Sequence, residues 1–152
     1  MKTLARERDL GEILQRLKRI RSDSPRRWGR MSPHGMVCHL ADSFRMVTGE
    51  KQVSAATGPL QRTVLKWVAL YSPLPWPAGI ATRPEIAQDV GGTSPLDFEA
   101  DLAQLEALTG IFVSRAGKAD RPQHPIFGRM SEAAWLRWAY LHMDHHLRQF
   151  GA

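Results

Sequence analysis

Hydrophobic residues recur along most of the chain at intervals of three and four, which is the spacing of amphipathic helices. In residues 4–20 they alternate with arginine and glutamate, and the apolar positions are Leu10, Ile13, Leu14, Leu17 and Ile20. The same spacing predicts further helices over about residues 33–49, 59–71, 95–114 and 132–150. No stretch of useful length alternates with the period of two that is typical of a strand.

Residues that commonly begin and end helices flank these ranges. Ser32 and Ser94 each precede a proline, which combines a hydroxyl N-cap with the residue preferred at the first helical position. Ser131 is expected to cap the last helix, while Gly49 and Gly151 are expected to end the second and last helices.

Two irregular segments separate the later helices. Residues 72–92 are rich in proline and glycine and predict a long ordered loop, and a second loop leads to Ser131. Together these features predict one all-α domain over residues 1–152, in which four long helices form a bundle with an additional short helix.

Composition limits the classes of protein that fit. With 152 residues, 43% hydrophobic and 24% charged, the chain has the size and apolar content of one ordinary domain. The net charge of +6 lies within residues 1–30, which hold ten basic and four acidic residues. A nucleic-acid groove would gather positive charge from several elements, so no nucleic-acid partner is expected.

The sequence also predicts a soluble, cytoplasmic protein. Cys38 is the single cysteine, which excludes an internal disulfide framework and any CxxC pair. The longest uncharged run, residues 67–82, is shorter than a membrane span and contains three prolines. No membrane partner is therefore expected, and the N-terminal segment lacks the apolar core of a secretory signal.

Candidate chemistry concentrates in the last predicted helix. His142 and His146 are four residues apart, so both project from one face and can chelate a divalent ion. Trp135 and Gln149 share that face, which makes them candidates for the inner wall of a pocket, and His145 lies at its edge. Because the intervening base position of an HExxH motif is not glutamate, the zincin class is excluded.

A third ligand would have to come from another helix. His39 borders the apolar side of the second predicted helix and is the best candidate, whereas His34 is about 140° around that helix. His124 lies in a loop, where a structural role or exposure is expected. The alternative for the His142–His146 pair is that both are core-edge residues satisfied by carbonyls or water.

Three passages carry a family resemblance: WGRMSPHGMVCHLADS (28–43), HPIFGRMSEAAW (124–135) and HMDHHLRQFG (142–151). They resemble the DinB-like (DinB/YfiT) four-helix-bundle superfamily, in particular a bacterial branch of unknown function. The resemblance implies one divalent ion, zinc or nickel above all, held by His39, His142 and His146. This sequence departs from many of those relatives in the three residues LRQ (147–149) that follow His146.

The resemblance also implies a function. Relatives include transferases that use low-molecular-weight thiols, and some are suspected hydrolases, so a metal-dependent transferase or hydrolase acting on a small molecule is expected. A homodimer is a further implication. The alternative is a non-enzymatic, metal-stabilised bundle with a binding or stress-response role. The sequence identifies neither the substrate nor the metal, because three imidazoles suit several divalent ions.

Overall fold

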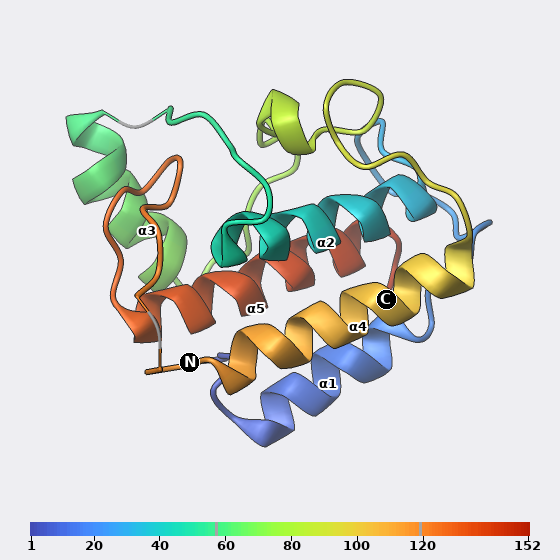
Figure 1. The fold of residues 1–152 in the computed structure, drawn as a ribbon, viewed down its shortest axis with the longest axis horizontal. Coiled ribbons are helices and arrows are strands. Elements are labelled where there is room, and N and C mark those ends of the chain that lie inside the picture. The colour runs from blue at the N-terminus through green and yellow to red at the C-terminus, as the bar shows by residue number, and fades with distance from the viewer. Residues whose placement is uncertain (57, 119) are drawn as a thin grey trace.

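The computed structural model describes residues 1–56, 58–118 and 120–152, and within these ranges it is helical and has no strand. The elements in chain order are α1 (Glu7–Leu17), α2 (Pro33–Thr48), the π-helical turn η1 (Gln61–Leu65), α3 (Lys66–Tyr71), the 3-10 turn η2 (Pro84–Ile86), α4 (Phe98–Ser114) and α5 (Glu132–Gln149) (Figure 1). The all-α prediction is confirmed.

Most of the expected helix boundaries are confirmed by their capping geometry. The Ser32 hydroxyl accepts a hydrogen bond from the Gly35 amide at 2.9 Å, with Pro33 at the first helical position. Ser131 caps α5 in the same way. Gly49 ends α2 with a φ of 84°, a conformation that costs glycine nothing and other residues about 1 kcal/mol or more.

The start of α4 and both ends of α1 differ from the prediction. The N-cap of α4 is Asp97 rather than Ser94, because the Asp97 carboxylate accepts from the Ala100 amide and a negative charge is favourable at a helix N-terminus. The first helix is shorter than residues 4–20. Residues 4–6 form a non-helical turn instead, in which the Arg6 amide donates to the Thr3 carbonyl, and the Leu4 amide donates to the carbonyl of Leu136 in α5.

The helices pack around one apolar core. Helix α2 contacts α4 and α5, while α1 and α3 both contact α5, so α5 lies at the centre of the arrangement (Figure 1). The rings of Phe44 and Phe112, from α2 and α4, are 5.2 Å apart. The largest fully buried side chains include Trp135, Phe112, Ile13, Leu17, Met36, Leu40, Leu105, Met143 and Leu147.

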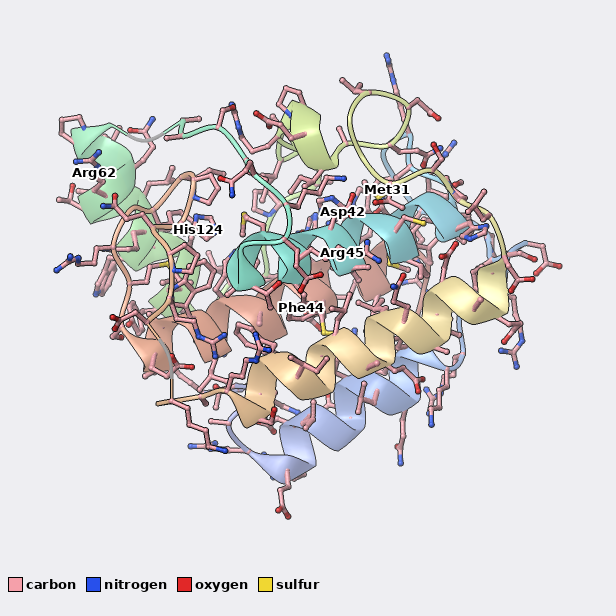
Figure 2. The ribbon with its side chains drawn as sticks, viewed as in Figure 1. Met31, Asp42, Phe44, Arg45, Arg62 and His124 are labelled. Carbon is pink, nitrogen blue, oxygen red and sulfur yellow. The ribbon has the colours of Figure 1, made fainter. Side chains whose placement is uncertain are left out.

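A buried carboxylate joins α2 to the end of the 72–92 loop. The Asp42 side chain is fully buried and accepts hydrogen bonds from Arg45 at 2.9 Å, Lys51 at 2.8 Å, and both the amide and the hydroxyl of Thr93 at 2.7 Å (Figure 2). Burial acts to raise the pKa of Asp42, but these hydrogen bonds outweigh it and lower the pKa below its ordinary value.

Replacing Asp42 with alanine is expected to lower the free energy of unfolding at pH 7 by about 3 kcal/mol, because the cations and the amide lose a buried partner. The exposed Asp23→Ala variant is the control, and it should change stability by less than about 0.5 kcal/mol.

The effect of Asp42→Ala depends on pH in a defined direction. A carboxyl whose pKa is lowered by folding stabilises the protein above its unfolded pKa of about 3.9, and this contribution disappears as pH falls through the folded value. Denaturant titrations should therefore show the difference between wild type and variant narrowing below about pH 4. A constant difference would contradict an ionised Asp42.

Candidate metal centre

Helices α2 and α5 bring three imidazoles together. The ring centroids of His39 and His142 are 5.0 Å apart, those of His39 and His146 are 4.8 Å apart, and those of His142 and His146 are 4.9 Å apart. The Nε2 atoms of His39 and His142 are separated by 3.1 Å. Ligand nitrogens in a tetrahedral zinc site are about 3.3 Å apart, because each lies 2.0–2.1 Å from the ion. The spacing therefore fits a shared divalent ion.

Hydrogen bonds at Nδ1 orient two of these rings. His39 Nδ1 lies 2.8 Å from the Ile86 carbonyl oxygen, which can only accept, so His39 donates there and its Nε2 carries a lone pair. His146 Nδ1 lies 3.0 Å from Gln149 Oε1. The Gln149 amide is itself fixed, since its Nε2 donates to the Trp28 carbonyl at 2.9 Å. His146 therefore also presents an unprotonated Nε2.

The surroundings favour neutral imidazoles. Burial lowers the pKa of His39, and burial together with the neighbouring histidines holds the pKa values of His142 and His146 well below the ordinary value of 6.5. A neutral imidazole is the form that binds a metal ion, so the donor set, its orientation and its protonation state all fit a divalent cation.

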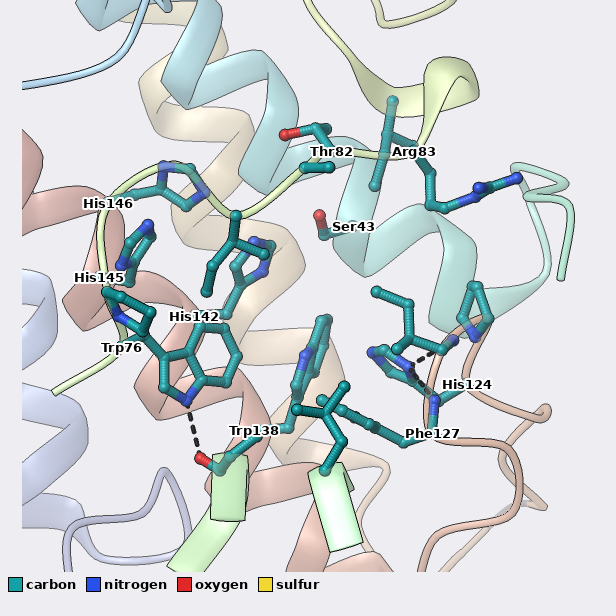
Figure 3. Close-up of a pocket in the computed structure, with 18 of the residues that line it drawn as sticks. Ser43, Trp76, Thr82, Arg83, His124, Phe127, Trp138, His142, His145 and His146 are labelled. Atoms are coloured by element: carbon teal, nitrogen blue, oxygen red, sulfur yellow. Dashed lines mark hydrogen bonds between the residues drawn. The ribbon is translucent and has the colours of Figure 1, made fainter. Parts of the chain in front are cut away.

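The three imidazoles face a cavity of about 630 Å³ (Figure 3). Its wall comes from α2, from η1 and α3, from the 72–86 segment, from residues 124–127 and from α5. Trp138 stacks on His142 with centroids 5.0 Å apart, and Trp76 lies 6.2 Å from the same ring. An ion held by the histidines would therefore face a space large enough for a small molecule.

Two of the other predicted site residues also lie at this centre. Gln149 is 5% exposed and contacts His146 directly, which gives it the role of a hydrogen-bond partner to a candidate ligand. His145 lines the cavity and packs between the rings of Trp28 and Trp76, at 5.9 and 6.1 Å. Its buried Nδ1 has no hydrogen-bond partner within the described part of the chain.

Trp135 does not line the cavity, which corrects the expectation that it forms the inner wall. It shares the angular direction of His142 but lies seven residues earlier, about 10 Å along the helix axis. There the rings of His124 and Trp138 pack against it, at 5.3 and 5.2 Å, and it is fully buried. Trp138, one turn before His142, occupies the wall instead.

Several wall residues were not identified from the sequence. His124 is buried, and its Nδ1 accepts from the amides of Ile126 and Phe127, which excludes the exposed alternative. The sequence does contain a signal for Trp138, because its spacing of four residues from His142 places it on the same helix face. Trp76 and Ile86 belong to the 72–92 loop, where no periodicity indicates which side chains turn inward.

A second polar cluster joins α2 to α4. The Asp101 carboxylate lies 2.7 Å from His34 Nε2 and accepts from the Cys38 thiol at 3.7 Å and from the Leu96 amide at 3.2 Å. Burial, with the charge of Asp101, raises the pKa of Cys38 to about 11, so this thiol is not a thiolate at neutral pH. His34, Cys38 and Asp101 have ligand atoms within 4.8 Å of one another, but hydrogen bonds among them already account for this arrangement.

Fold and site together define an all-helical protein with a buried cluster of histidines at the base of a cavity. The chain matches, over residues 3–152, the family described as protein of unknown function (DUF1569), and it belongs to that family. No curated protein and no solved structure matches the chain. Within the described residues, no helix is both long enough and apolar enough to span a bilayer.

Replacing Gln149 with alanine removes the acceptor that orients His146. Loss of such a hydrogen bond typically weakens metal binding about 10- to 100-fold, so a reduction of this size is expected in a titration against a chelator of known affinity. The exposed Gln15→Ala variant on α1 should bind as the wild type does. Equal affinity in the Gln149 variant would show that this hydrogen bond does not orient a ligand.

Proposed function

We propose that this protein is a metal-dependent transferase or hydrolase of the DinB-like type, in which His39, His142 and His146 hold one divalent ion. The observation that supports this most strongly is the convergence of three neutral imidazoles, two of them oriented through Nδ1, on a cavity of about 630 Å³. A catalytic zinc site uses three protein ligands and leaves one position for water or substrate.

In this proposal a bound ion lowers the pKa of a water to about 7 or stabilises the thiolate of a small, low-molecular-weight thiol. The protein's own groups prepare that position. The Ile86 carbonyl and the Gln149 amide keep two imidazoles aimed inward, while the rings of Trp76 and Trp138 limit the water around His142. His145 adds a further imidazole ring to the wall of the same cavity.

The proposal includes several finer points. The metal is zinc or nickel, both of which imidazole ligands suit. Helices α1, α2, α4 and α5 form a DinB-like four-helix bundle, and α3 with the 72–92 loop adds the outer wall of the cavity. The protein is bacterial, acts in the cytoplasm, where the Cys38 thiol stays reduced, and assembles as a homodimer.

The metal assignment is tested by elemental analysis of protein purified without an affinity tag. Wild type should contain one equivalent of zinc or nickel per chain, and His142→Ala should contain almost none, because two imidazoles bind far more weakly than three. His34→Ala is the matched control, since His34 belongs to the second cluster, and it should retain the full equivalent. Metal lost from His34→Ala and kept in His142→Ala would overturn the assignment.

Access to the ion separates an enzyme from a metal-stabilised binding protein. Cobalt-loaded protein should change its visible absorption when azide or 2-mercaptoethanol is added, because either can enter an open coordination position. An unchanged spectrum with both reagents would mean that the coordination sphere is closed, and it would favour the non-enzymatic alternative.

A further inference from the structure

Two cavities of different character meet at the histidines. Besides the larger cavity, a second of about 390 Å³ is also lined by His145 and His146. Both cavities share these two histidines together with Ile80 and Thr82, which therefore form the partition between them. Of the three candidate ligands, only His146 lines the second cavity, next to Gln149, which contacts its Nδ1.

The larger cavity is apolar over most of its wall. Beyond the histidines, its polar side chains are limited to Ser43, Ser72, Thr82 and Arg83, and no carboxylate occurs among the described residues that line it. Arg83 donates a hydrogen bond to the Ser54 hydroxyl and lies 4.0 Å from Glu85, while its buried Nε has no hydrogen-bond partner within the described part of the chain. Apart from the histidines, Arg83 is the single charged side chain among the described residues that line this cavity.

The mouth of the larger cavity leaves apolar side chains in contact with water. Leu74 is 74% exposed, Ile80 48% and Val68 45%, although all three belong to the cavity wall. A bound apolar molecule would remove part of this surface from water, and each buried methylene would strengthen binding about fourfold. The free energy of binding in this cavity is therefore most favourable for a ligand that has apolar surface of its own.

The smaller cavity has a different lining. The side chains of Arg30, Gln88, Asp89 and Gln149 contribute to it, along with the glycines at 29 and 79. These groups offer both hydrogen-bond donors and acceptors, and they carry charges of both signs. Water or another polar molecule in this cavity can therefore approach His146 from the side on which Gln149 contacts its Nδ1.

We infer that the larger cavity binds an aliphatic or aromatic compound whose single polar group faces His39, His142 and His146. The inference rests on the proposed function for the role of the metal. It adds the class of substrate: an apolar molecule with one metal-binding group, rather than a sugar, a nucleotide or a peptide, whose many polar groups this wall would leave unpaired.

The apolar cavity is tested first in metal-free protein, with the neutral fluorescent probe N-phenyl-1-naphthylamine. Wild type should bind the probe, and Val68→Asp should bind it at least about tenfold more weakly, because the variant places a charge in the wall. Val64→Asp is the matched control, since Val64 is an exposed residue of the same helical segment that does not line the cavity, and it should bind as wild type. Absent binding, or equal losses in both variants, would overturn the inference.

The position of the polar group is tested in metal-loaded protein by comparing hexanethiol with 2-mercaptoethanol. Hexanethiol should bind at least about tenfold more tightly, because its extra methylenes reach the apolar wall, and Val68→Asp should remove this preference. If the protein holds metal but binds both thiols equally, the inference fails and the proposed function stands. If the protein holds no metal, the proposed function fails. The part of the inference that places the polar group at the histidines then fails too.

Discussion

The hydrogen bond that His39 donates to the Ile86 carbonyl is the interaction on which the site depends most. It fixes which nitrogen of His39 carries the proton, and so leaves Nε2 directed at His142. It also attaches the middle of the 72–92 loop to α2, and that loop supplies Trp76 and the Ile80–Arg83 stretch of the cavity wall. This one hydrogen bond of 2.8 Å therefore orients the candidate ligand His39 and also attaches the loop that forms part of the cavity wall.

Three imidazoles crowd together here, with His39 and His146 buried and His142 half-buried. Because His39 carries its proton on Nδ1, its Nε2 accepts a hydrogen bond from the Nε2–H tautomer of His142 at 3.1 Å. Adding a further proton to any ring is opposed by burial and by the neighbouring rings. The protein maintains this arrangement with Gln149 and the Ile86 carbonyl, each of which holds a ring from behind. A chain that needed only apolar packing here would gain stability from leucine or methionine at these positions.

The sequence predicts those features of this structure that are determined by residues close together along the chain. Capping by Ser32 and Ser131, and the shared face of His142, His146 and Gln149, follow from helix geometry and are confirmed. Helical angle does not report position along the helix axis, and for this reason it predicts Trp135 in a cavity wall that Trp138 forms instead. Ser94 and Asp97 are both good N-caps, and the sequence does not show that Asp97, whose carboxylate accepts from the Ala100 amide, is the one used. The loop residues Trp76 and Ile86 carry no periodic signal at all.

The cavity itself argues against a purely structural ion. A metal ion that only holds helices together is best enclosed by four protein ligands and a packed core. Every void beside it would remove dispersion contacts and lower stability. Here the described residues bring three imidazoles together and leave about 630 Å³ beside them, walled by two tryptophans and bordered by exposed Leu74. Keeping this space open lowers stability, which is a cost that a protein would have to tolerate if it binds a molecule in front of the histidines, as proposed above.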